Sequence, residues 1–119
     1  MVRLYLFPLR SLETLDMSHN QFTLVPTELP RPLRKLILQH NNIHNIPPFA
    51  FRHLQPGLQS LQLSHNALTN AGVEHVSFVG TYRSLGELLL NNNVLEDVPA
   101  SMRQFKNLKV LRLDNNHIR

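Results

Sequence analysis

Leucines recur along the chain at a spacing of three residues and then two, and an asparagine follows three residues after the last of them. The clearest instance is "LRKLILQHNNI" at residues 33–43. Alternation around the second and third leucines predicts a short strand with one face in the core and the other open. The unit occurs five times, beginning at Leu12, Leu33, Leu58, Leu85 and Leu108.

All five units fit L-x-x-L-x-L-x-x-N-x-(L/I/F), with Met17 and Phe22 as conservative departures, and this is the leucine-rich repeat pattern. One unit cannot bury its apolar face alone, so neighbouring units supply the core. The predicted fold is an α/β leucine-rich repeat solenoid, one uncapped domain over residues 1–119. A curved parallel sheet forms its concave face, and loops and short turns form its convex face. Residues 1–11 are expected to be a ragged approach in which Phe7 and Leu9 pack.

The repeated asparagines fall where each unit turns inward after its strand. A buried amide there can donate and accept hydrogen bonds, and so can satisfy backbone groups that the bend leaves unpaired. We therefore predict a structural role for Asn20, Asn41, Asn66, Asn93 and Asn116.

The convex segments are expected to contribute aromatic packing. After Pro47 and Pro48, which favour an extended path, the second unit carries Phe49, Phe51 and Leu54 as predicted packing groups. Phe51 and Phe78 each lie seven residues before the next unit's first leucine, which predicts equivalent core positions.

Composition and motifs limit the kinds of chemistry that the chain can perform. The chain has 42% hydrophobic and 17% charged residues, which indicates a folded domain, and no cysteine for a disulfide, a thiolate metal site or a thiol nucleophile. No phosphate-binding glycine loop or nucleophile elbow is present, and Glu96 and Asp97 are adjacent in a turn rather than paired across a cleft. We expect no enzyme activity, no cofactor and no membrane insertion.

The units are 21, 25, 27 and 23 residues long, measured between first leucines. This irregular spacing, with "PGL" before the third unit and the long "GVEHVSFVGTYRSL" segment, resembles the extracellular matrix protein 2-like branch of the small leucine-rich proteoglycan family. The resemblance implies an extracellular matrix or secreted location. It also implies binding of collagen-type matrix proteins, glycosaminoglycan or cell-surface receptors. The cysteine-bearing caps usual in that group are expected to lie outside this chain or to be lost.

The open face is where a protein partner is expected to bind. Its predicted positions include Glu13, Thr14, Asp16, Ser18, Gln59, Ser60, Ser64, Glu87, Asn91, Val110 and Asp114. Ile37 and Leu89 are apolar where solvent is expected, which could mark contact spots, although isolated exposed apolar residues are common. The partner-binding candidates are Arg34, Lys35, Ile37, Gln39, Gln62, Leu89 and Arg112.

The formal net charge is +4, and the cations fall into two groups. One is Arg31, Arg34 and Lys35, and the other is Arg103, Lys106, Lys109 and Arg112, the candidates for binding sulfated glycosaminoglycan. An ordinary solvated face is the alternative. Because no aromatic residues are interleaved with these cations, nucleic acid is not an expected partner.

Histidines occupy one repeat position in three successive units, at His19, His40 and His65, and should stack as a ladder on one edge. Such a ladder lacks a tetrahedral fourth ligand, so we predict no metal site. The function predicted overall is matrix binding. An intracellular scaffold or adaptor for a signalling protein, and a truncated product without function, remain the alternatives.

Overall fold

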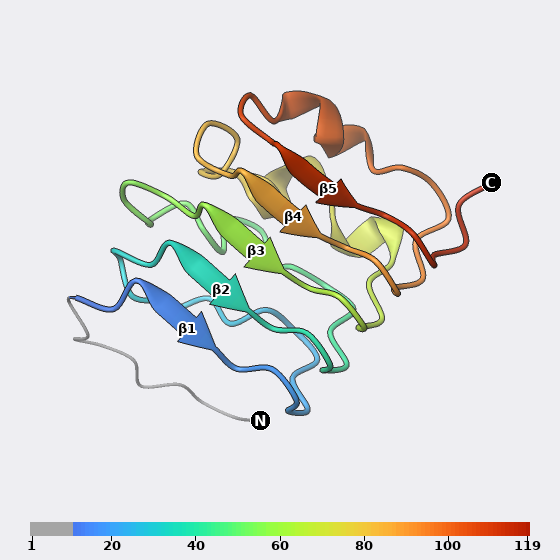
Figure 1. Cartoon of the computed structure of the whole chain (residues 1–119), viewed down its shortest axis with the longest axis horizontal. Coiled ribbons are helices and arrows are strands. Elements are labelled where there is room, and N and C mark those ends of the chain that lie inside the picture. Colours follow the sequence, from blue (N-terminus) through green and yellow to red (C-terminus); the bar gives the residue numbers. More distant parts are fainter. Residues whose placement is uncertain (1–10) are drawn as a thin grey trace.

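The computed structural model describes residues 11–119 of the chain, and the packing predicted for Phe7 and Leu9 lies outside that range. Five strands of three residues each form one parallel sheet in sequential order, β1 to β5. They are β1 (Thr14–Asp16), β2 (Lys35–Ile37), β3 (Ser60–Gln62), β4 (Glu87–Leu89) and β5 (Val110–Arg112). Figure 1 shows the strands side by side, each joined to the next by a return segment behind the sheet. The predicted leucine-rich repeat solenoid is confirmed.

The register aligns equivalent residues of successive units. Leu15, Leu36, Leu61, Leu88 and Leu111 are direct partners across the four strand pairs. The backbone ladder continues beyond the strands, since the Met17 amide donates to the Ile37 carbonyl over 2.8 Å and the His19 amide donates to the Gln39 carbonyl over 3.0 Å. Each unit therefore repeats the path of its neighbour for several residues on either side of the short strand.

The core lies between the sheet and the convex segments. The leucines of the second, third and fourth units are fully enclosed, as the period of two requires: Leu33, Leu36, Leu38, Leu58, Leu61, Leu63, Leu85, Leu88 and Leu90. Leu111 on β5 is 38% exposed, because within the described chain that strand has a neighbour on one side only.

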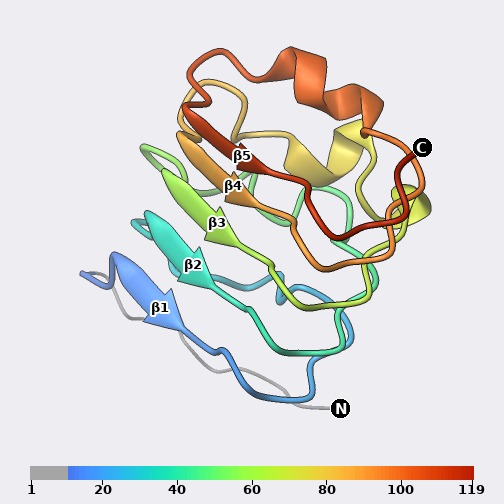
Figure 2. The same cartoon turned by 45° about the vertical axis from the view of Figure 1, so that its right-hand side comes forward.

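The convex side is built from turns and three short 3-10 helices. These are η1 (Asn70–Gly72), η2 (His75–Phe78) and η3 (Ala100–Gln104), and Figure 2 shows them on the return segments of the third and fourth units. Gly72 makes a close approach here, because a Cβ at this position would lie 2.1 Å from the His44 carbonyl oxygen. Within residues 11–119, no helix has the length and apolar character needed to cross a bilayer.

Two of the three predicted aromatic positions of the convex side are correct. Phe51 and Phe78 are both fully buried, and Phe78 meets the rings of Tyr82 and Phe105 edge-on. The prediction for Phe49 is wrong. Its side chain is 44% exposed, because a left-handed backbone at φ 62° turns it outward, and the Arg52 guanidinium lies 4.7 Å above its ring.

Candidate functional site

The open face of the sheet carries two rows of side chains, one from the first and one from the third residue of each strand. The register aligns the first row as Thr14, Lys35, Ser60, Glu87 and Val110. It aligns the second row as Asp16, Ile37, Gln62, Leu89 and Arg112. The sheet thus brings most of the predicted partner-binding residues onto one surface, with Arg34 immediately before β2 and Gln39 two residues after it.

Ile37 and Leu89 are the apolar members of the second row, and Gln62 lies between them. Adjacent strands are about 4.8 Å apart, so the two apolar side chains are spaced by roughly 10 Å. Both are half-buried, with part of each side chain open to solvent. They form two separate apolar contact points in the second row, whose other members are polar or charged.

The charged side chains of this face differ in whether they form hydrogen bonds or ion pairs with their neighbours. The Glu87 carboxylate accepts a hydrogen bond from the Ser60 hydroxyl over 2.6 Å and another from the Gln62 amide over 3.4 Å. Arg34 pairs with Glu13 over 3.8 Å, whereas Lys35 is exposed and forms no ion pair with another described residue. Lys35 and Glu87 therefore offer opposite charges on either side of Ser60.

Arg112 is less available for binding a partner than its position in the sequence indicates. Its Nε and Nη2 donate to the two carboxylate oxygens of Asp114 over 3.0 and 2.7 Å. This hydrogen-bonded pair raises the pKa of Arg112 and lowers the pKa of Asp114. Because Asp114 already compensates its charge, Arg112 contributes little free positive charge to either a protein or a polysaccharide site.

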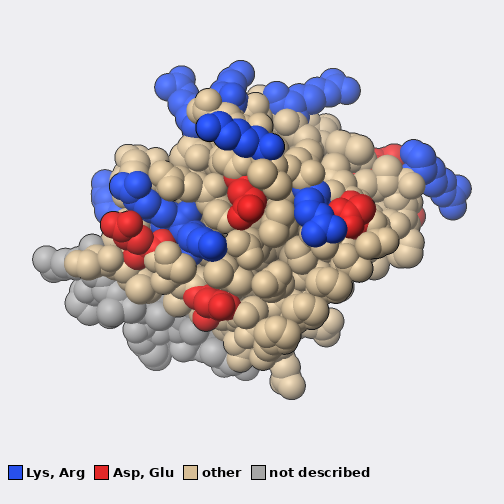
Figure 3. Space-filling view, in the orientation of Figure 1, with Lys and Arg blue, Asp and Glu red and all other residues tan. Residues whose placement is uncertain are grey.

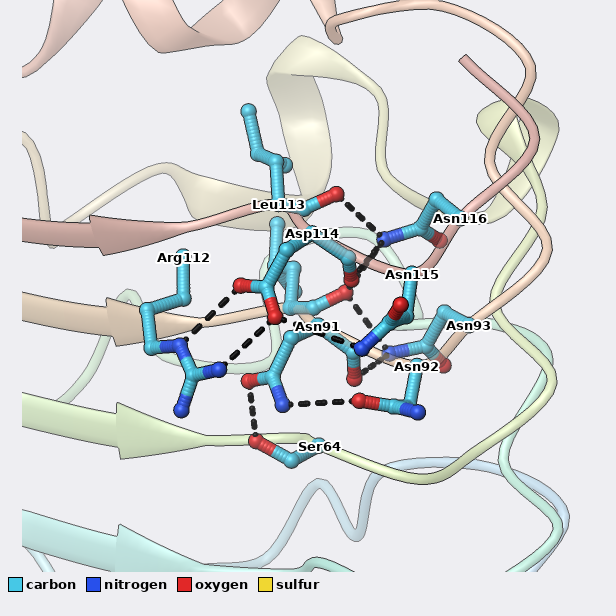
Figure 4. A network of polar contacts seen from close by, with 10 residues as sticks. Ser64, Asn91, Asn92, Asn93, Arg112, Leu113, Asp114, Asn115 and Asn116 are labelled. Atoms are coloured by element: carbon cyan, nitrogen blue, oxygen red, sulfur yellow. Dashed lines mark hydrogen bonds and ion pairs between the residues drawn. The ribbon is translucent and has the colours of Figure 1, made fainter.

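Two positions predicted to lie on the open face are instead buried. Ser64 is 2% and Asn91 is 5% exposed, and the Ser64 hydroxyl donates to the Asn91 side-chain oxygen over 2.7 Å. The Asn91 amide in turn donates to the Asn92 side-chain oxygen over 3.0 Å (Figure 4). Both residues lie two positions beyond the end of their strands, and their side chains satisfy one another instead of facing a partner.

The repeated asparagines Asn20, Asn41, Asn66, Asn93 and Asn116 form a column, and within it side chains both donate and accept hydrogen bonds. The Asn66 side-chain oxygen accepts from the Ile43 amide over 3.0 Å, and its nitrogen donates to the carbonyls of Leu38 and Leu63 over 3.0 and 3.1 Å. Asn41, Asn93 and Asn116 repeat this arrangement, and Asn20 donates to two carbonyls. Each interior asparagine thus links two neighbouring units.

Three members of the second cationic group, all except Arg112, lie at the edge of the sheet where the strands begin. Arg103 lies on η3, and Lys106 and Lys109 lie in the segment between η3 and β5. The Lys106 amide donates to the Tyr82 carbonyl over 2.8 Å and the Asn107 side chain donates to the Arg83 carbonyl, which brings Arg83 beside this segment. Figure 3 shows basic side chains collected along this edge, above β5. We call Arg83, Arg103, Lys106 and Lys109 the edge basic group.

Arg83 was missed at the sequence level because it lies in a different unit. It precedes Lys106 by 23 residues, which is also the distance between the first leucines Leu85 and Leu108. Residues separated by one unit length become neighbours in a solenoid. That offset was therefore the signal that could have identified it.

The predicted histidine ladder is present. The rings of His19 and His40 stack at 4.5 Å between centroids, and those of His40 and His65 stack at 4.4 Å. Among the described residues, no group of three or more His, Cys, Asp or Glu side chains is arranged to hold a metal ion.

A shallow hollow on the convex side lies between the segments of η1, η2 and η3. Its titratable lining groups are Glu74 and His75, beside polar Asn70, Ser101 and Gln104. The His75 ring stacks on Tyr82, whose hydroxyl donates to the His75 carbonyl over 2.8 Å. The Ser101 hydroxyl in this hollow donates to the Val73 carbonyl over 3.2 Å and not to His75, so no base activates it as a nucleophile.

Comparison with known proteins agrees with this architecture. Two models of the leucine rich repeat match the chain, over residues 11–31 and 31–81. Fibromodulin of Mus musculus is 36% identical over 93% of this chain, and lumican of Bos taurus is 37% identical over 92% of it. Lumican of Oryctolagus cuniculus is 41% identical over 83% of the chain. The chain spans 36%, 39% and 50% of the lengths of these three relatives.

Proposed function

Because the chain belongs to the leucine-rich repeat family, with relatives of the small leucine-rich proteoglycan type, we propose that it is an extracellular matrix binding module. It acts without catalysis and presents its concave sheet to a matrix protein of the collagen type. A secreted location and a place in the extracellular matrix protein 2-like branch are parts of the same proposal.

The pairing of apolar and charged groups on the open face carries this proposal. Ile37 and Leu89 provide two partly exposed apolar contact points, while Lys35 and Glu87 in the neighbouring row provide opposite charges. A collagen-type rod has no apolar core to expose, and its surface offers imino rings and charged side chains along its length. The concave face of the sheet, with separate apolar and charged side chains held by the strands, is complementary to such a surface.

Replacing both apolar contact points tests the concave face directly. The double variant Ile37→Ser, Leu89→Ser should bind immobilised fibrillar collagen about tenfold or more weakly than the parent, because two contact points are lost. Binding is measured by surface plasmon resonance, after thermal melts have shown that the variant is folded.

The matched control is Leu24→Ser, Val98→Ser, which removes two exposed apolar side chains outside the strand rows. It should bind collagen as the parent does. A parent that fails to bind collagen, or equal losses in the two double variants, would contradict the use of the concave face.

A sulfated glycosaminoglycan is the second ligand class in the proposal, and the edge basic group supports it. Its members come from three successive units and lie where the strands begin, whereas the Arg112 and Asp114 pair lies at the other end of β5. Sulfated chains bind such groups through ion pairs and the release of counterions, so the affinity falls as salt rises.

Reversing two of these charges should abolish heparin retention. At pH 7.4 the double variant Lys106→Glu, Lys109→Glu should pass through a heparin column unretained. The reason is that the edge basic group would then carry no net positive charge. The parent should elute later in a sodium chloride gradient.

A control with the same change in net charge is Arg52→Glu, Arg119→Glu. Arg52 lies on the convex side over Phe49, and Arg119 follows the last asparagine turn. This control should be retained longer than the Lys106 and Lys109 variant. Equal early elution of both would mean that net charge, and not the edge basic group, governs retention.

A further inference from the structure

The histidine ladder lies at the opposite edge of the sheet from the edge basic group, in the turns that follow the strands. His19, His40 and His65 are exposed, and each has a left-handed backbone with φ of 57 to 58°. Histidine and asparagine are among the residues that tolerate this conformation best. The same position is filled by Asn92 and Asn115 in the fourth and fifth units, with φ of 59 and 57°.

The backbone fixes the spacing of the rings. The amides of His19, His40 and His65 donate to the carbonyls of Gln39, Ser64 and Asn91 in the next unit, over 3.0 to 3.1 Å. The rings are within 8 and 9° of parallel. Their ring nitrogens consequently lie in parallel planes and do not converge on one point, which disfavours chelation of a single ion and favours a linear ligand.

Within residues 11–119, few other charged groups lie near the ladder. Asp16 on β1 interacts electrostatically with His19, but its carboxylate already accepts hydrogen bonds from the Ser18 hydroxyl and amide over 2.6 and 3.0 Å. His44 is a further titratable group in the second turn, and at the far end Asp114 is paired with Arg112. Residues that adjoin the ladder in the same turns, Ser18, Gln39, Ser64, Asn20, Asn41 and Asn66, are uncharged.

Stacked imidazoles are compatible with one another only while they are mostly neutral. Shielding from water between its two neighbours lowers the pKa of His40, and the charges of His65 and His19 lower it further. Unperturbed histidine has a pKa of about 6.5, so acidification turns a neutral stack into closely spaced positive charges. An anionic chain laid along the stack would relieve their repulsion.

We propose that the histidine ladder is an acid-dependent binding site for a sulfated polysaccharide. The site is silent at neutral pH and gains affinity on acidification, because imidazole groups take up protons as the pH falls. It is separate from the edge basic group, which is charged at both pH values. Binding and protonation are linked, so a bound polyanion must also favour proton uptake by the ladder.

The test uses heparin and the Lys106→Glu, Lys109→Glu chain, in which the neutral-pH site is removed. Its affinity for heparin at 0.15 M salt should rise on the order of tenfold or more from pH 7.4 to pH 5.0. Each added ion pair contributes about four- to fivefold at this salt concentration. Adding His19→Asn, His40→Asn and His65→Asn should abolish the rise, and Asn92 and Asn115 show that asparagine fits this backbone.

A matched control carries His44→Asn and His117→Asn, two exposed histidines outside the ladder, and should keep most of the rise. A second readout is the NMR titration of the His40 ring, whose midpoint should move to higher pH when heparin is present. The proposal is overturned if affinity does not rise at pH 5.0, if the ladder variant rises as its parent does, or if the midpoint stays fixed. If only the edge basic group fails to bind heparin, the parent will bind weakly at pH 7.4. The three tests of the histidine ladder keep their meaning in that case.

Discussion

Phe78→Ala should lower the free energy of unfolding by roughly 3–5 kcal/mol. Phe78 is fully buried at the end of η2, and its ring meets those of Tyr82 and Phe105 at centroid distances of 6.4 and 5.4 Å. Truncation removes the largest apolar group of the third return segment and leaves a cavity that the constrained backbone cannot close. Urea denaturation followed by circular dichroism measures the change.

Phe49→Ala is the matched control in the same chain. Its exposed ring contacts the Arg52 guanidinium and is not part of the core, so the loss should be below about 1 kcal/mol. Phe78→Leu retains part of the buried volume and provides a measurable value if the alanine variant does not fold. Equal stability of the Phe78→Ala and Phe49→Ala proteins would contradict the packing described for the convex side.

Asn66→Ala should destabilise the fold by roughly 1–3 kcal/mol, because it leaves buried backbone groups without partners. The side chain accepts from Ile43 in its neighbouring unit, and it donates to carbonyls in both units, those of Leu38 and Leu63. Asn66→Asp should also be destabilising above pH 5. A carboxylate can accept from the Ile43 amide but cannot donate to the two carbonyls.

The matched control for this prediction is Asn42→Ala. Asn42 is exposed, and its side chain makes no hydrogen bond with another described residue, so its melting temperature should match that of the parent. If Asn66→Ala melts at the same temperature as Asn42→Ala, the asparagine column does not hold the units together.

The arrangement of the open-face residues and the stability of the fold both depend on the regular stacking of the units. The short strands place one side chain of each unit in every row, so a contact point on the open face is defined jointly by several units. Unfolding of one unit would displace the rows on both sides of it. Collagen binding and heparin binding should therefore be measured only on variants whose melting behaviour is known.

The repeat pattern predicted the fold with little ambiguity. Spacings of three and two between leucines define which residues enter the core, and five aligned units leave one way to stack them. The stacking of His19, His40 and His65 followed from their shared position in the unit. These features depend only on position within a repeat, which a single sequence contains.

The candidate site was predictable only in part, since it depends on contacts between units and on local bends. The pattern located Ile37 and Leu89 on the open face, but it could not show that Ser64 and Asn91 are buried and bond to each other. Arg112 and Asp114 lie two residues apart on one face, yet their pairing depends on side-chain conformation.

The sequence by itself determined the strands, their order, the enclosed leucines and the positions of the asparagines, because each is a property of the repeating unit. Only the tertiary structure decided that Phe49 points outward, that Arg83 joins Lys106 at one edge, and that Arg112 forms an ion pair with Asp114. The physical reason is that the Arg112 and Asp114 pair depends on side-chain conformation within one unit, while the other two outcomes arise between neighbouring units. There, the backbone path of one unit and the side chains of the next compete for the same space and the same hydrogen bonds.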